Sequence, residues 1–350
     1  MTVSAFNHLW LSGLFGDLAM GEVFSPERQM AHMLAFEAAW SRACGAAGLF
    51  DPTRAETAAC AIETAQVNYA DIAAGMAQDG VPVPRLVKQL QAIAPADALH
   101  KGATSQDVVD TALAMTLREA SDLIAARLAD LETHLMALEA RFGDRPLMGR
   151  TRMQAATQIT VRDRILTWHC PLKGHLDRLE MLRPKIEKVQ IGGASGDRKA
   201  LGDKADTVVA EVAKSLGLAP TNKAWHTMRE SVTEYASFLS LVSGTLGKVG
   251  QDIALMSQQG IEEISMSRGG GSSAMPHKQN PVAAELLVTL ARFNATQVSV
   301  MHHAMVHEQE RSGAAWALEW MILPQMAMAT ARALTVAIDL SQNITRLGSD

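Results

Sequence analysis

Apolar residues recur every three or four positions over three long stretches, and this periodicity constrains the fold of the chain more than any other feature. The first stretch covers 106–138, the second covers 232–256 with a heptad pattern, and the third covers 283–300. Helices of this length cannot bury an apolar face alone. The pattern therefore predicts a bundle of long helices, and we expect the 232–256 stripe to be buried only between subunits of an oligomer.

Composition and helix-start signals favour an all-α protein. The chain has nineteen methionines but only 5% aromatic residues, whereas sheets use aromatic and β-branched residues heavily. Ser-Pro at 25–26 and Asp-Pro at 51–52 predict helices that end near 47 and 66, and a third short helix is expected at 85–94. We therefore expect a helical N-terminal domain at 1–100 and a central long-helix domain at 101–350 that carries the loop 269–281.

Three glycines lie inside the second long stretch, at Gly244, Gly247 and Gly250. Glycine inside a helix costs roughly 1 kcal/mol relative to alanine. We interpret the three as positions of close contact with a neighbouring helix.

Charge and cysteine content exclude several classes of function. A net charge of −5 leaves no basic surface for nucleic acid. We see no run that approaches the length needed to cross a membrane, and the N-terminus lacks the pattern of a signal peptide. The three cysteines, Cys44, Cys60 and Cys170, lack metal-binding spacing and predict buried thiols in a reducing compartment. We expect a cytoplasmic protein.

Residues 269–281 read Gly-Gly-Gly-Ser-Ser-Ala-Met-Pro-His-Lys-Gln-Asn-Pro and form a loop between helical stretches. Glycines make its first part permissive, and two prolines exclude regular helix from the rest. Ser272, Ser273, Lys278 and Asn280 are an unusual density of polar groups that suits an anionic substrate. A flexible linker is the alternative, but a linker has no use for the rigid Met-Pro-x-Lys-x-Asn-Pro segment.

The eleven residues 271–281 resemble the signature loop of the fumarase/aspartase superfamily, Gly-Ser-Ser-x-Met-Pro-x-Lys-x-Asn-Pro, at every fixed position. The resemblance implies a fumarase/aspartase-like fold, with a small helical N-terminal domain, a long central bundle and a homotetramer whose active sites are each shared by three subunits. It implies no cofactor. It also implies a third, C-terminal helical domain, for which this chain ends too soon after the third long stretch; the outer packing of the site is therefore open.

Two further segments resemble the superfamily's other site regions. Thr104 and Ser105 open the first long helix, where either could be only a helix cap; the resemblance implies that the pair binds a substrate carboxylate. Residues 149–157 resemble the second region and supply Thr151 and Gln154 as substrate-binding candidates. Arg152 stands where the lyases carry histidine, and arginine cannot act as a general acid. It either binds substrate or is a solvated surface cation.

Segments 100–103, 225–229 and 307–320 resemble the 3-carboxy-cis,cis-muconate cycloisomerase branch of the superfamily. They add His226 and Arg311 as substrate-binding candidates. His303 and His307 have the i, i+4 spacing of a two-ligand metal site, but no third ligand is recognisable, and we expect no metal.

This branch implies lactonisation of a tricarboxylate diene, 3-carboxy-cis,cis-muconate, to 4-carboxymuconolactone in protocatechuate degradation. Ser272 is implied as the proton donor, with Lys278, Asn280 and the Thr104–Ser105 pair stabilising a dianion. Ser273 and Met275 complete the substrate-binding candidates. The alternatives are a fumarate-releasing lyase of the adenylosuccinate or argininosuccinate type, against which Arg152 argues, and a non-catalytic helical assembly, whose signature loop we would expect to be damaged.

Overall fold

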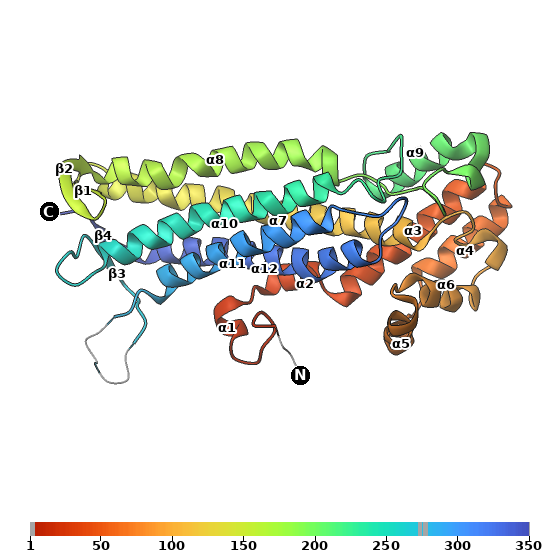
Figure 1. Ribbon diagram of the computed structural model, residues 1–350, viewed down its shortest axis with the longest axis horizontal. Coiled ribbons are helices and arrows are strands. Elements are labelled where there is room, and N and C mark those ends of the chain that lie inside the picture. The colour runs from red at the N-terminus through yellow and green to blue at the C-terminus, as the bar shows by residue number, and fades with distance from the viewer. Residues whose placement is uncertain (1–3, 272–274, 276–278, 350) are drawn as a thin grey trace.

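The computed structural model describes residues 4–271, 275 and 279–349, and it confirms the all-α prediction. Long helices run side by side along the major axis and form the body of the molecule (Figure 1). They are α7 (Ser105–Phe142), α8 (Val161–Ile186), α10 (Glu230–Met256), α11 (Val282–Ala304) and α12 (Ala314–Asn343). The three predicted long helices are confirmed as α7, α10 and α11.

The sequence pattern did not predict α8 or α12, for physical reasons. Helix α8 contains Pro171 and Pro184 and many charged residues, which obscure its apolar stripe. Helix α12 contains Pro324 and is apolar on most sides, because neighbouring helices surround it. Periodicity detects helices with one buried face and is weak for both of these cases.

Of the shorter helices, the first two lie along the side of the bundle and the others gather at one of its ends (Figure 1). They are α1 (Ser12–Phe15), α2 (Leu18–Val23), α3 (Pro26–Ala46), α4 (Pro52–Glu63), α5 (Tyr69–Asp79), α6 (Val83–Gln91), η1 (Ala96–Ala98), η2 (Lys199–Lys204) and α9 (Ala205–Leu216). The predicted starts of α3 and α4 are confirmed, since the Ser25 and Asp51 side chains accept hydrogen bonds from the first turns. Helix α9 shares an apolar core with α3, so this core joins residues 30–115 to 189–218. The division at residue 100 stays a prediction.

Two small antiparallel strand pairs lie at the opposite end of the bundle. Strand β1 (Pro146–Thr151) pairs with β2 (Gln154–Thr160), and β3 (Ile264–Met266) pairs with β4 (Ile344–Leu347). Arg152 and Met153 form the turn between β1 and β2, both with positive φ, as a two-residue hairpin turn requires. The sequence did not predict these strands, which are too short to change the fold class.

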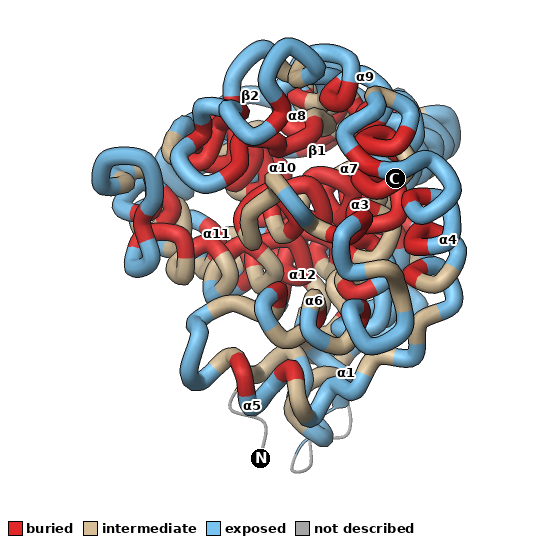
Figure 2. The backbone as a smooth tube through the Cα atoms, turned by 90° about the vertical axis from the view of Figure 1, so that its right-hand side faces the viewer, coloured by how far each residue is buried: buried red, intermediate tan, exposed pale blue. Residues whose placement is uncertain are grey.

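The heptad stripe of α10 is buried within one chain, so our expectation that only an oligomer would bury it is wrong. Each of its residues is at most 6% exposed: Val232, Tyr235, Leu239, Val242, Leu246, Val249, Ile253 and Met256. Helices α8, α11 and α12 supply the partners, and buried residues fill the centre of the bundle seen end on (Figure 2). The α10 stripe is therefore buried without a second subunit.

Two of the three glycines in α10 are close contacts, and the third is not. A Cβ at Gly247 would lie 2.5 Å from the Ala291 Cβ, and one at Gly250 would lie 2.4 Å from the Ala284 carbonyl oxygen. A Cβ at Gly244 would meet no other described part of the chain within 4 Å, so the interpretation fails there. Close approach of α10 to α11 explains the other two positions.

Helix α12 corrects our statement about membrane-length segments. Within the described chain it is the one helix long and apolar enough, by length and composition, to cross a membrane. However, 61% of its most apolar window is buried against α7, α10 and α11. This burial is what the central helix of a bundle requires.

The expectation of three buried thiols holds for Cys44 only. Cys60 and Cys170 are exposed, and all three cysteines are free. Burial raises the pKa of the Cys44 thiol to about 12, which keeps it protonated.

Candidate active site

The described site candidates fall into two groups at opposite ends of the bundle. The first group, at the end where α7 begins, consists of Thr104, Ser105, His226 and Arg311. The second group, at the end of the β1–β2 hairpin, consists of Thr151, Arg152, Gln154, Met275 and Asn280. Ser272, Ser273 and Lys278 lie outside the described residues, so their predicted roles stay predictions.

Helix length keeps these groups apart within one chain. Helix α7 has 38 residues and separates Thr104 from the hairpin that carries Thr151, a span of about 57 Å at 1.5 Å per residue. Helix α10 likewise separates His226 from the signature loop, and α11 separates that loop from Arg311. One molecule of a small substrate cannot contact both groups of the same chain.

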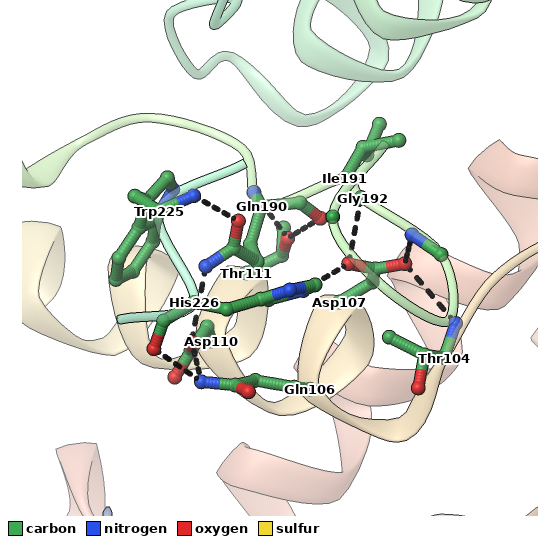
Figure 3. Close-up of polar contacts among 12 residues, drawn as sticks. Thr104, Gln106, Asp107, Asp110, Thr111, Gln190, Ile191, Gly192, Trp225 and His226 are labelled. Carbon is green, nitrogen blue, oxygen red and sulfur yellow. Dashed lines mark hydrogen bonds and ion pairs between the residues drawn. The ribbon is translucent and has the colours of Figure 1, made fainter. Parts of the chain in front are cut away.

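Asp107 organises the first group at the beginning of α7 (Figure 3). Its Oδ2 accepts hydrogen bonds from the backbone N–H groups of Thr104 (3.0 Å) and Gly193 (2.9 Å). Its Oδ1 accepts from the Gly192 N–H (2.9 Å) and from Nε2 of His226 (2.8 Å). The carboxylate is fully buried. It therefore joins the first turn of α7, the 192–193 loop and the segment before α10.

Arg311 lies beside this helix start. Its Nε donates to the Gln106 side-chain oxygen at 3.2 Å, and its Nη2 donates to the carbonyl oxygens of Gly193 (3.3 Å) and Ala194 (3.1 Å). Thr104 and Ser105, in the same turn, are half-buried. A helix amino end and a guanidinium together form an environment that favours a carboxylate ligand.

His226 has one ring nitrogen still available. Its Nε2 faces the Asp107 carboxylate, which only accepts, so Nε2 carries a proton. Its Nδ1 is buried and has no hydrogen-bond partner among the described residues. Buried polar atoms are normally satisfied, so this nitrogen marks a place for a ligand or water.

A buried ion cluster lies behind the first group. Arg229 donates from Nη1 to Asp110 Oδ2 (2.7 Å) and from Nε to Glu319 Oε1 (2.8 Å), and all three side chains are at most 2% exposed. Burial opposes the charge on Arg229, but the two carboxylates overcome it and raise the pKa of the guanidinium. Burial also raises the pKa of the Glu319 carboxyl, against the opposing influence of Arg229.

The structure adds two histidines near the first group that were not predicted to bind substrate. His100 Nδ1 lies 2.6 Å from the fully buried Glu37 carboxylate, which overcomes burial and raises the pKa of His100. Both ring nitrogens of His307 are buried without a partner among the described residues, and burial lowers the pKa of its imidazole. Both belong to segments that resemble the cycloisomerase branch, and this resemblance is the sequence feature that could have identified them as site residues.

The second group is exposed. Thr151, Arg152 and Gln154 surround the hairpin turn and face solvent in the single chain. An ion pair of 2.6 Å between Arg150 Nη1 and Glu263 Oε1 fastens the hairpin to the segment before β3. The hairpin therefore presents these side chains outward on an anchored support.

The base of the signature loop is closed by backbone pairing. Gly270 and Asn280 exchange N–H···O bonds of 2.9 and 2.8 Å, and the Asn280 side chain donates to the Gly271 carbonyl at 3.4 Å. Met275 is exposed. A cavity of about 290 Å³ lies beside this base, with Arg268 and Asp339 among its lining residues.

The spacing argument for a metal does not apply here. Helix α11 ends at Ala304, so His303 and His307 do not share a helical face. Among the described residues, no cluster of three or more His, Cys, Asp or Glu side chains could hold a metal ion.

Comparison with known proteins relates this chain to cycloisomerases and lyases. Residues 20–298 match the protein family described as Lyase. A 3-carboxy-cis,cis-muconate cycloisomerase of Pseudomonas aeruginosa is 38% identical over 334 residues, covering 93% of this chain and 73% of that protein. The crystal structure of 3-carboxy-cis,cis-muconate lactonizing enzyme from Pseudomonas putida aligns with a TM-score of 0.90 at 36% identity, over 97% of this chain and 77% of that one. Fumarate lyase from Mesorhizobium sp. BNC1 aligns with a TM-score of 0.89 at 31% identity, over 95% and 76%.

Proposed function

We propose that this chain, which belongs to the lyase family of the fumarase/aspartase superfamily, catalyses the lactonisation of 3-carboxy-cis,cis-muconate to 4-carboxymuconolactone. One observation carries the proposal: the similarity to a 3-carboxy-cis,cis-muconate cycloisomerase extends over 93% of the chain at 38% identity. It thus covers most of the molecule and is not restricted to one motif. This reaction would place the enzyme in the aerobic breakdown of aromatic acids through protocatechuate.

The chemistry suits a site made of anion-binding groups. One carboxylate of the substrate adds to a double bond of the same molecule, so nucleophile and electrophile are already tethered. The electron pair moves toward the remaining carboxylate as an enolate-like dianion, and the adjacent carbon then takes a proton. Apart from this proton, which the tricarboxylate takes up, no atom is gained or lost, and no cofactor is needed. The main task of the protein is to stabilise the dianion with preorganised donors.

The first group supplies donors of this kind. The amino end of α7, with Thr104 and Ser105, and the guanidinium of Arg311 are suited to hold one carboxylate. His226 offers Nδ1 to the same region. We assign proton donation to Ser272 and dianion stabilisation to Lys278 and Asn280, as the resemblance implies.

Arg152 favours cycloisomerisation over the release of fumarate. It stands at the hairpin turn, where the superfamily's lyases carry a histidine that can protonate a leaving group. Arginine stays protonated at any accessible pH and cannot fill that role. Lactonisation has no leaving group, so this position is free to hold a permanent cation.

We further propose that the enzyme is a homotetramer whose active sites combine groups from different subunits. The separation of about 57 Å along α7 supports this, because the two groups can meet only when they come from different chains. Large apolar side chains exposed on the long helices add support, since Met181, Leu241 and Met321 are each more than half exposed. Three free cysteines suit a reducing, cytoplasmic location.

An absorbance assay with purified protein tests the reaction. We expect loss of the conjugated-diene absorbance of 3-carboxy-cis,cis-muconate and no fumarate release from adenylosuccinate. Fumarate release without diene loss would favour the lyase alternative. Inactivity on both, in a folded protein, would favour a non-catalytic assembly.

A further inference from the structure

Asp110 is buried one turn beyond Asp107 on α7 and receives five hydrogen bonds. The donors are Arg229 Nη1 (2.7 Å), Arg229 Nη2 (3.1 Å), Trp316 Nε1 (3.1 Å), Gln106 Nε2 (3.0 Å) and Gln190 Nε2 (3.2 Å). Only an ionised carboxylate can accept from all of these, because it has no hydrogen of its own. Each of these polar groups must therefore turn a hydrogen-bond donor toward Asp110.

This direction matters most for Gln106, in the first turn of α7. A side-chain amide has a donor end and an acceptor end, and Asp110 selects the donor end. The same NH₂ group also donates to the His226 carbonyl oxygen at 2.9 Å. The Gln106 oxygen must then point the other way, where it accepts from Arg311 Nε at 3.2 Å. Asp110 thus shares with the His226 carbonyl the task of directing the amide that Arg311 Nε contacts, while the Gly193 and Ala194 carbonyls hold Arg311 Nη2.

Gln190 shows the same relation on the other side (Figure 3). Its NH₂ group donates to Asp110, so its oxygen is directed toward the Trp225 backbone N–H at 2.7 Å. Trp225 precedes His226 in the chain. One carboxylate therefore orients two fully buried amides, and each amide holds a segment that carries a substrate-binding candidate.

We propose that Asp110 is a positioning residue that holds Arg311 in its substrate-binding place through the oriented amide of Gln106. This inference rests on the proposed function, in which Arg311 binds a carboxylate of the substrate. An asparagine at 110 has the same shape but presents an NH₂ group of its own. The Gln106 amide would then turn, its NH₂ would face the donor Nε of Arg311, and its oxygen would face the His226 carbonyl.

A double-mutant cycle with Asp110→Asn and Arg311→Met tests the proposal. In the wild-type background, Asp110→Asn is expected to raise KM for 3-carboxy-cis,cis-muconate by about tenfold or more, with a smaller change in kcat. In the Arg311→Met background, the same substitution should raise KM by less than about threefold, because its target is gone. Equal effects in both backgrounds, or no change of KM in Asp110→Asn, would overturn the proposal.

Glu319→Gln is the matched control. It removes the other carboxylate from Arg229, but in the described structure Glu319 makes no hydrogen bond to Gln106 or Gln190. Its effect on KM should be the same with and without Arg311. A coupling to Arg311 as large as that of Asp110→Asn would mean that loss of charge at Arg229 is the cause, and would overturn the assignment to the amide.

A crystal structure of the Asp110→Asn variant separates this inference from the proposed function. A wild-type enzyme that leaves 3-carboxy-cis,cis-muconate unchanged contradicts the function, whatever the variants do. The variant structure still decides the positioning: we expect the hydrogen bond between Arg311 Nε and the Gln106 oxygen, 3.2 Å in the wild type, to be lost. If Arg311 keeps its place beside Gln106, Asp110 does not position it.

Discussion

The Asp107 carboxylate and the His226 imidazole lie 2.8 Å apart, Oδ1 to Nε2, although 119 positions separate them in the chain. Both side chains are buried, at 0% and 3% exposure. The contact commits Nε2 of His226 to a structural hydrogen bond and leaves Nδ1 free for a ligand. The two nitrogens of one ring thus have separable tasks.

Two substitutions of His226 should separate those tasks. Glutamine can place an amide donor where Nε2 lies, so His226→Gln should keep the free energy of unfolding within about 1 kcal/mol of wild type while KM rises. Asparagine is too short to reach Asp107, so His226→Asn should lower the free energy of unfolding by about 1–3 kcal/mol. Urea unfolding and steady-state kinetics measure both effects. A wild-type KM in His226→Gln would show that Nδ1 does not contact the substrate.

Arg152 should act in binding and charge balance. Arg152→Met should raise KM and so weaken substrate binding by about 1.5–3 kcal/mol, the range for a hydrogen bond to a charged group. It should add no titration to the pH profile. Arg152→Lys should recover only part of the loss, because an ammonium cannot form a bidentate pair. Wild-type kinetics in both variants would identify a solvated surface cation. Unchanged affinity with collapsed turnover would mean that the guanidinium acts on the transition state.

Gly244 and Gly250 form a matched pair for helix packing. Alanine at Gly250 would press on the Ala284 carbonyl, so Gly250→Ala should lower the free energy of unfolding by about 1–3 kcal/mol. Gly244 faces open space, and Gly244→Ala should raise it by about 0.5–1 kcal/mol through helix propensity. Chemical denaturation measures the two shifts. Shifts of the same sign would contradict the packing described between α10 and α11.

His175 should make stability depend on pH. Its Nε2 lies 2.8 Å from Thr245 Oγ1 between α8 and α10, and burial, aided by Arg178, lowers the pKa of His175 to about 4. The unfolded chain has a histidine pKa of about 6.5, so between these values the unfolded state binds the extra proton. The free energy of unfolding should therefore fall by up to about 3 kcal/mol as the pH decreases from about 6.5 to about 4.

His175→Gln is the control for this pH effect. Urea unfolding at several pH values should show a smaller decrease in the variant than in the wild type. Parallel curves for the two proteins would assign the pH dependence to other groups.

The sequence predicted those parts of the fold that local patterns encode. The stripes of α7, α10 and α11 and the caps at Ser25 and Asp51 are local signals, and the structure agrees with them. The partner of the α10 stripe was not predictable, because a heptad pattern does not say whether the facing helix belongs to the same chain. Helix α12 is apolar on most sides and so gave only a weak periodic signal.

For the candidate site, too, local motifs were predictable and contacts between distant parts of the chain were not. Thr104, Ser105, His226 and Arg311 were predicted from motifs, and the structure brings them to one end of the bundle. The long-range hydrogen bonds of Asp107 and Asp110 were not predicted, because they join positions at least 80 apart in the chain. The placement of Thr151 at the far end follows only from the length of α7.

The most direct test of a shared active site is complementation between two inactive variants. Thr104→Val/Ser105→Ala disables the first group, and Ser272→Ala disables the signature loop. Each variant alone should be inactive on 3-carboxy-cis,cis-muconate. After the chains are mixed, dissociated and reassembled, activity should return in roughly a quarter of the sites, because random assembly pairs an intact first group with an intact loop. Reassembled hybrids, verified by mass, that stay inactive would contradict a site shared between subunits, as would a wild-type monomer that is active by light scattering and assay.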